Sequence, residues 1–224
     1  MYSILEHYLS TNHILMIGMI VTFILTFFLL EHPFSFLPSD QGRAFAVNGS
    51  LSKGKLRGVG FIFVLCFLIS SVLFLPIDVE YVIYAILLFA MMISGYLDDA
   101  SKTPWNEYKK GLIDLVISVV AVLTYMNFNS TTICFGADEI VIPKALFLIL
   151  GVILIWVSVN VTNCTDGVDG LCASLCSVTL LAFGVLFAPI LQKYAMANFL
   201  FLSVLFAYLY FNLSLIHISE PTRP

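Results

Sequence analysis

The sequence predicts an all-α fold, a polytopic bundle of transmembrane helices, and three observations support this. Of the 224 residues, 60% are hydrophobic and only 11% are charged, whereas about 25% of the residues in an average soluble domain are charged. The apolar residues gather in about seven long runs, each near the roughly 20 residues that cross a bilayer. The runs lack the alternation of barrel strands, and a lipid-exposed segment must satisfy its backbone hydrogen bonds internally, so helices are expected.

In chain order, the runs end where the sequence becomes polar or meets a proline. Pro76, Pro143 and Pro189 lie at or near run ends, where a proline disturbs a helix least. Asp114 lies one turn into the fourth run, and we expect it to face a polar cleft near the membrane interface. The expected helices are 14–30, 58–77, 81–97, 111–128, 145–162, 170–191 and 195–213.

The count of helices assigns the loops to the two sides of the membrane. Loops 31–57, 98–110 and 163–169 share one side and hold most of the lysines and arginines, whereas the other side holds only Lys144 and Lys193. By the positive-inside rule the cation-rich side is cytoplasmic and the N-terminus is outside. The chain is therefore expected to be a multi-pass protein with its acidic loops in the cytoplasm.

Charge and cysteine content exclude other classes of protein. The net charge of −4 leaves no basic patch, so nucleic acid is not an expected partner. Most of the five cysteines lie in or beside apolar runs, which favours buried thiols over a disulfide framework.

Two acidic segments are expected to meet at the cytoplasmic face. Asp98 and Asp99 end the third run, and adjacent carboxylates suit a hard cation such as Mg²⁺ that bridges to substrate phosphate. Taken alone, such a pair is equally typical of a solvated helix end. The pair indicates a site because Asp166 and Asp169 are expected on the same side of the membrane. These two acids lie between two apolar runs, where acids are energetically costly.

The segment from Asn160 to Gly170 is the most specific signal. Asn160 and Asn163 are three residues apart and share a helix face if the fifth helix continues through them. Asp166 and Asp169 repeat that spacing, and each precedes a glycine that permits a sharp turn. Such amides and carboxylates can hold a metal, ribose hydroxyls or a sugar; the alternative is a capped, glycine-broken helix junction.

The basic loop 31–57 is rich in glycine and contains Lys53. Glycines allow close approach to a ligand, and lysines supply donors for phosphate oxygens. The alternative is that these cations serve topology and contact lipid headgroups. The loop matches neither a P-loop nor a dinucleotide fingerprint.

The stretch from Asn160 to Leu171, Asn-x-x-Asn-x-Thr-Asp-Gly-x-Asp-Gly-Leu, resembles the signature of the polyprenyl-phosphate N-acetylhexosamine-1-phosphate transferases. Thr165 before Asp166, and the pattern Asp98-Asp99-x-x-Lys102, resemble the branch of phospho-N-acetylmuramoyl-pentapeptide transferases. The resemblance covers roughly residues 14 to 213.

That resemblance implies a bundle of ten helices with a cytoplasmic cleft, in the plasma membrane of a bacterium. It implies transfer of phospho-MurNAc-pentapeptide from UDP-MurNAc-pentapeptide to undecaprenyl phosphate with Mg²⁺, giving lipid I and UMP in peptidoglycan biosynthesis. The expected partners are these two substrates and membrane lipids, and a homodimer is left open.

The resemblance also implies the residues that perform the chemistry. Asp98, Asp99 and Asp166 are expected to be catalytic, with Asp98 accepting a proton. Asp98, Asp99 and Asn163 are the expected metal ligands.

The remaining implied roles concern the substrates. Asn160, Asn163 and Asp169 are expected to contact nucleotide or sugar. Lys53, which matches the lysine before the family's Gly-Thr-Pro-Thr-Met-Gly-Gly element, and Lys102 are expected to meet phosphate.

The likeness to the family ends with the seventh expected helix. The family continues with a Pro-Ala-x-x-Phe-Met-Gly-Asp-type loop, three more helices and a His-rich loop, whereas residues 214–224 fit none of these. We expect residues 1–213 to be a truncated integral membrane transferase domain and the tail to be a sequencing or frameshift artefact. On this hypothesis the chain lacks a third catalytic or metal-binding aspartate, which the family carries further along its sequence, and is inactive as it stands.

Two other functions compete with this one. A sister transferase would load GlcNAc-1-phosphate from UDP-GlcNAc onto the same lipid. An ion-coupled transporter would use its acids to carry protons or cations, but transporter sites lie near the bilayer midplane, whereas these acids cluster at one face.

Overall fold

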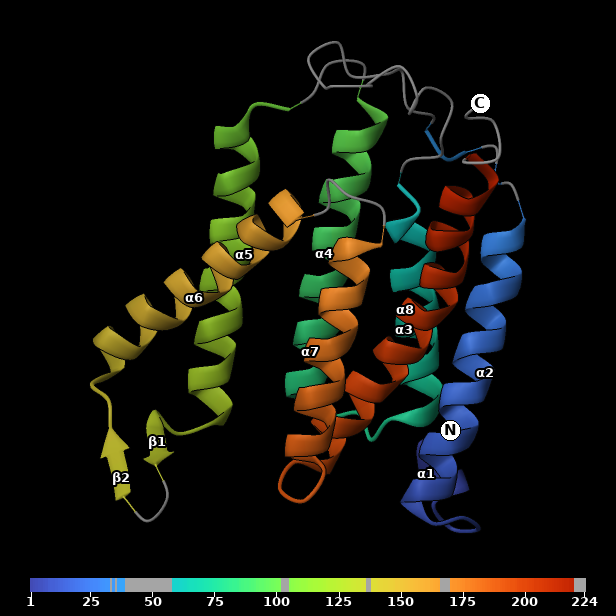
Figure 1. The fold of residues 1–224 in the computed structure, drawn as a ribbon. Helices are drawn as coiled ribbons and strands as arrows, with labels where there is room; N and C mark the ends of the chain where they lie inside the picture. The colour runs from blue at the N-terminus through green and yellow to red at the C-terminus, as the bar shows by residue number, and fades with distance from the viewer. Residues whose placement is uncertain are drawn as a thin grey trace.

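The computed structural model describes residues 1–32, 34, 36–38, 58–101, 105–135, 138–165 and 170–219. Within these ranges the chain forms a bundle of helices with one small hairpin at its edge (Figure 1), which confirms the predicted all-α class. The elements are α1 Tyr2–Leu5, α2 Thr11–Glu31, α3 Gly60–Phe74, α4 Val79–Ala100, α5 Glu107–Phe128, β1 Thr132–Phe135, β2 Asp138–Val141, α6 Lys144–Thr165, α7 Leu171–Phe187 and α8 Gln192–Ser219.

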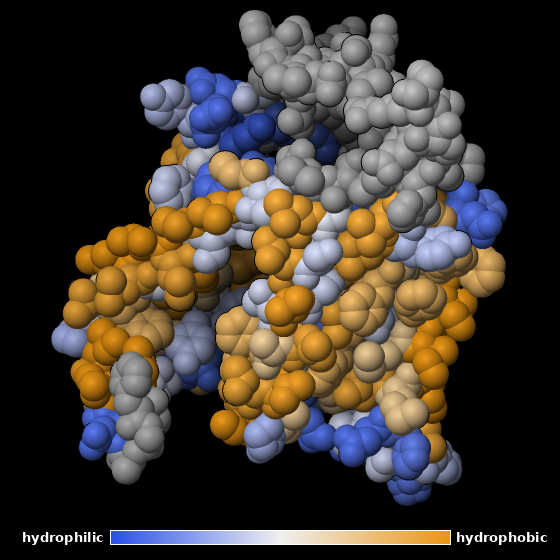
Figure 2. All heavy atoms as spheres, in the orientation of Figure 1, coloured by the Kyte–Doolittle hydropathy of each residue, from blue (hydrophilic) through white to orange (hydrophobic). Residues whose placement is uncertain are grey.

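Every apolar run forms a helix, and five of them suffice in length and hydropathy to cross a bilayer. These five are α2, α4, α5, α6 and the Gln192–Leu213 part of α8. The apolar helices α3 and α7 are shorter, with 15 and 17 residues, and α3 rises only about 22 Å against a hydrocarbon core of about 30 Å. Figure 2 shows hydrophobic residues over most of the middle of the visible face and hydrophilic ones mainly toward its two ends. The chain is therefore a multi-pass membrane protein.

Several features differ from the expectations drawn from the sequence. The short helix α1 and the β1–β2 hairpin were not expected, and the hairpin lies in what was read as a plain loop. The backbone of α8 continues to Ser219, past the expected end at residue 213. Cys164 is exposed, so the prediction of buried thiols is wrong there, although Cys66 is buried.

The core lies where α2, α3 and α8 meet. Gly18 of α2 allows the close approach, because a Cβ there would lie 3.1 Å from both Leu200 Cδ2 of α8 and Phe74 Cγ of α3. Small residues serve this purpose in membranes, where packing rather than hydrophobic burial drives helix association. The buried core residues are Ile14, Phe67, Phe74, Leu75, Tyr81, Met196, Leu200 and Val204.

A buried carboxylate joins three helices at the end of the bundle where α4 begins. Glu80 is only 7% exposed. Its Oε1 accepts hydrogen bonds from Tyr84 Oη at 3.1 Å and Asn129 Nδ2 at 2.7 Å, and its Oε2 accepts one from Tyr194 Oη at 3.0 Å. A buried charge is tolerated when its lone pairs are satisfied in this way. The contacts fix α4, the C-terminal end of α5 and α8 to one another.

Asp78 lies beside this cluster and caps α4. Its Oδ1 accepts a hydrogen bond from the Tyr81 amide at 2.8 Å, and its Oδ2 forms an ion pair with Lys193 of α8. Partial burial acts to raise the pKa of Asp78, but the hydrogen bonds from Lys193 and the Tyr81 amide outweigh it and hold the pKa below its usual value. Asp78 therefore contributes to stability as the carboxylate.

We expect Glu80→Ala to destabilise the bundle by on the order of 2 kcal/mol, because three donors lose their acceptor in a buried place. Thermal unfolding in detergent micelles measures this, with Glu139→Ala at an exposed position of the hairpin as the control. Equal melting temperatures for the two variants would contradict the role of Glu80.

Asp78 gives an expectation for pH. Because its folded-state pKa is lowered, its contribution is present above the unfolded pKa of about 4 and is lost as the pH falls through the folded pKa. The difference in melting temperature between the parent chain and Asp78→Asn should be constant from about pH 7 to 5 and shrink below about pH 4. A difference that grows with acidification would show the opposite sign.

Candidate functional site

Asp98 lies on the last turn of α4 and is held by two donors from the following segment. The Trp105 amide donates to Asp98 Oδ1 at 2.9 Å, and Lys110 Nζ on the first turn of α5 lies 2.5 Å from Asp98 Oδ2. The Asp98 side chain is 19% exposed, so this ion pair is partly shielded from solvent. The Asp98 carboxylate therefore contacts both the connection between α4 and α5 and the first turn of α5.

The indole of Trp105 fixes that connection further. Its Nε1 donates to Ser101 Oγ at 2.9 Å, and Lys109 Nζ lies 3.4 Å above the ring centroid. Asp99, next to Asp98 on the same turn, is half-buried. Two acids and two lysines thus share one end of the α4–α5 pair.

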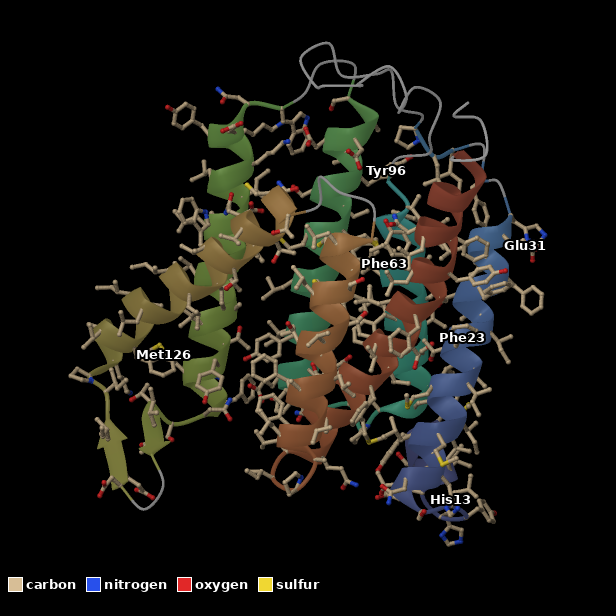
Figure 3. All side chains as sticks on the ribbon, in the orientation of Figure 1. His13, Phe23, Glu31, Phe63, Tyr96 and Met126 are labelled. Carbon is tan, nitrogen blue, oxygen red and sulfur yellow. The ribbon has the colours of Figure 1, made fainter. Side chains whose placement is uncertain are left out.

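The other side of the same α4 end packs toward the segment after α2. Tyr96, labelled in Figure 3 near the upper end of α4, donates from its hydroxyl to Phe36 O at 2.9 Å, and its ring lies 5.2 Å from that of Phe61 at the start of α3. These contacts fix the position of α4 just before Asp98.

Helix α6 carries the first half of the acidic segment. It continues unbroken to Thr165, past the expected end at residue 162. The condition for Asn160 and Asn163 to share a helix face is therefore met. Asn160 is half-buried and donates from Nδ2 to Trp156 O at 2.8 Å, whereas Asn163 is exposed. The amide of Asn163 is therefore accessible near the end of the helix.

A hydrogen bond joins α6 to the start of α5, beside the Asp98 region. Trp156 Nε1 donates to the carbonyl oxygen of Gly111 at 2.8 Å, and Gly111 follows Lys110, the partner of Asp98. The end of α4 and the last turns of α6 are thereby connected through the start of α5. Both lie in the upper part of the molecule in Figure 1.

Four of the predicted site residues, Asp166, Asp169, Lys53 and Lys102, lie outside the described residues. The segment from Asn160 to Gly170 is described at residues 160–165 and again at Gly170, which has φ +77°, a conformation that favours glycine.

Gly170 packs closely on the end of α8. A Cβ at Gly170 would lie 2.5 Å from Leu213 Cδ2 and 3.9 Å from Asn212 Oδ1. Asn212 donates from Nδ2 to Tyr208 Oη at 2.8 Å, but among the described residues its buried Oδ1 has no hydrogen-bond partner. The start of α7 therefore adjoins an unsatisfied amide oxygen.

Sequence reasoning did not assign Lys110, Trp105 or Asn212 to the site. Lys110 was counted only as a topological cation, and its pairing with an acid twelve positions earlier depends on the turn between two helices. An isolated asparagine at the end of an apolar run was the available signal for Asn212, because polar groups are costly there.

The acidic pair fits a magnesium ion by its chemistry. Among the described residues no three histidines, cysteines or acids converge. Asp98 and Asp99 nevertheless offer only oxygen ligands, and Mg²⁺ is commonly held by one or two carboxylates together with water and substrate phosphates. The carboxylate of Asp98 retains lone pairs beyond its two hydrogen bonds.

Comparison with known proteins places these residues in a family. The model of glycosyl transferase family 4 matches residues 81–218, which contain Asp98, Asp99 and the whole acidic segment. The phospho-N-acetylmuramoyl-pentapeptide-transferases of two strains of Treponema pallidum, one of them strain Nichols, are each 34% identical over 189 residues, 82% of this chain and 52% of theirs. The protein of that name from Gloeothece citriformis strain PCC 7424 is 28% identical over 121 residues, 50% of this chain and 33% of its own.

The chain thus spans about half the length of the first two curated relatives. The relatives carry the name of the branch that the motifs resemble. The family match covers α4 to α8, except for the first two residues of α4 and the last residue of α8. The chain therefore belongs to glycosyl transferase family 4.

Proposed function

We propose that this membrane protein is a phosphoglycosyl transferase that moves phospho-MurNAc-pentapeptide from UDP-MurNAc-pentapeptide to undecaprenyl phosphate, giving lipid I and UMP. The observation that supports this most is the partly buried Asp98, held by Lys110 and the Trp105 amide at the end of a membrane helix. The family match and the names of the relatives support the reaction class.

The chemistry exchanges one pyrophosphate bond for another and needs no separate energy source. An oxygen of the lipid phosphate attacks the phosphorus that bears the sugar, and the bond to UMP breaks, with UMP leaving with the electron pair. The protein must align two polyanions and neutralise their charge, which is the main task in phosphoryl transfer.

We assign the steps to the residues as follows. Asp98 accepts the proton of the lipid phosphate, and Lys110 fixes the orientation of that carboxylate. Asp98, Asp99 and Asn163 would hold a Mg²⁺ ion, which supplies neutralisation of the pyrophosphate when bound. Asp166 would act as a further catalytic carboxylate, as the family resemblance implies.

The substrate contacts follow from the same likeness. Asn160, Asn163 and Asp169 would contact the nucleotide and sugar, and Lys53 and Lys102 the phosphates. A lipid acceptor explains why the acids lie at helix ends, and the distribution of cations supports a cytoplasmic location for this end.

The donor test separates this proposal from the sister transferase. The protein tested is a version of this chain extended to the length of its relatives. Membranes that contain it should form labelled lipid from UDP-MurNAc-pentapeptide and Mg²⁺, and little from UDP-GlcNAc. The reverse preference would establish the GlcNAc-1-phosphate transferase instead. Cation flux in proteoliposomes without lipid product would favour a transporter.

The role of Asp98 predicts the effect of Asp98→Asn in the same preparation. Turnover should fall by about two orders of magnitude or more, as for the loss of a general base, while the protein remains folded, because asparagine keeps an oxygen that can accept from the Trp105 amide. Near-normal turnover would remove Asp98 from the chemistry.

Lys110 offers a sharper test because Lys109 is its matched neighbour. Lys110→Met should lower turnover about 10- to 100-fold and change the Mg²⁺ dependence, because a residue that orients an acid supports the metal site. Lys109→Met, which removes only the contact with the Trp105 ring, should have a smaller effect, and Lys110→Arg should restore part of the activity. Equal losses for the two methionine variants would contradict the positioning role.

A further inference from the structure

The β1–β2 hairpin lies at the end of the molecule opposite the C-terminal end of α4, which carries Asp98 (Figure 1). Its antiparallel register pairs Thr132 with Val141 and Ile133 with Ile140. Ile140 is 52% exposed and Val141 71%. Exposed aliphatic side chains on a small sheet are unfavourable in water and indicate a contact.

Short connections keep the hairpin close to the ends of two membrane helices. Only residues 129–131 separate α5 from β1, and only 142–143 separate β2 from α6. A three-residue connection spans at most about 10 Å. The first two rungs of the hairpin therefore lie close to the end of α5 and the start of α6.

The base of the hairpin is also fixed. The Thr131 hydroxyl donates to Ile142 O at 2.8 Å, and the Ile142 amide donates to Thr131 O at 3.1 Å. Asn129, directly before the hairpin, donates to the buried Glu80 at 2.7 Å. These bonds hold the first rungs to the bundle.

Polarity changes along the hairpin in the direction expected for a membrane boundary. The two rungs nearest the helices carry Ile133, Ile140 and Val141, whereas the two distal positions of β2 are the exposed acids Asp138 and Glu139. Along β2, apolar residues thus lie toward the helices and charges lie away from them, whereas β1 has Cys134 and Phe135 in the two distal rungs.

Other segments at this end expose similar side chains. Ile4 in α1 is 67% exposed and Tyr8 just after it 78%, and Ile190 in the α7–α8 turn is 77% exposed. Figure 1 shows α1, this turn and the hairpin at the same end of the bundle. Aromatic and aliphatic residues at a common level are typical of an interfacial belt.

We propose that the hairpin is a membrane-contact element whose two basal rungs insert into the headgroup region of the leaflet opposite the candidate site. Ile133, Ile140 and Val141 contact lipid, and the acids Asp138 and Glu139 of β2 stay in water. The occupant of this apolar surface is the lipid bilayer rather than another protein.

Tryptophan fluorescence of the complete 224-residue chain in phosphatidylcholine vesicles tests this. Ile140→Trp places the probe in the proposed lipid contact, and Glu139→Trp places it at the neighbouring position toward the turn. Difference spectra against the parent chain remove the signals of Trp105 and Trp156. Val141→Trp serves as a second probe if Ile140→Trp alters the melting temperature.

Ile140→Trp should show a blue-shifted emission that is quenched by lipid brominated near the headgroup and resists aqueous acrylamide. Glu139→Trp should show the reverse. Equal acrylamide quenching of both variants would overturn the proposal. Protection of Ile140→Trp from both quenchers would also overturn it, because it would indicate a protein partner or a second copy of the chain.

Discussion

The ion pair between Lys110 and Asp98 is the interaction on which the candidate site depends. An acid at the end of an apolar helix needs a counter-charge or hydrogen bonds if it is to be partly buried. Lys110 supplies the charge from the next helix, and the Trp105 amide supplies the hydrogen bond. The connection between α4 and α5 is thereby organised around the carboxylate, and Trp156 extends this order to α6 through Gly111.

Helix α4 is fixed at both ends by polar contacts. Glu80 and Asp98 are eighteen residues apart, which corresponds to about 27 Å along a helix, close to the roughly 30 Å of a bilayer's hydrocarbon core. One end joins α5 and α8 through the Glu80 cluster, and the other joins α5 through Lys110. Polar groups therefore lie at the two membrane boundaries, with the apolar body of the helix between them.

The sequence predicted the parts of this protein that hydropathy controls. Each apolar run became a helix, although α6 continues to Thr165, three residues past the expected end at residue 162. The hairpin was missed because its two four-residue strands depend on pairing between Ile133 and Ile140, which the hydropathy of a short mixed segment does not reveal. The family resemblance could be recognised from the sequence because the motif from Asn160 to Leu171 is specific.

The contacts of the site were not predictable in the same way. The partner of Asp98 is set by how the chain turns at Trp105, and the buried oxygen of Asn212 depends on how α8 meets the start of α7. The roles of Asp166, Asp169, Lys53 and Lys102 stay predictions, because these residues lie outside the described part of the chain.

Chemical labelling in sealed vesicles tests the central claim, that the α4–α5 connection and the end of α6 face one compartment. The natural Cys164 is exposed at the end of α6, Tyr108 beside Lys110 is 86% exposed, and Glu139 lies on the hairpin. In chains that keep only the cysteine under test, with the other cysteines replaced by serine, a membrane-impermeant thiol reagent should reach Cys164 and the Tyr108→Cys variant from the same side. It should reach the Glu139→Cys variant only from the other side. Reaction of Cys164 and the Tyr108→Cys variant from opposite sides would contradict the account.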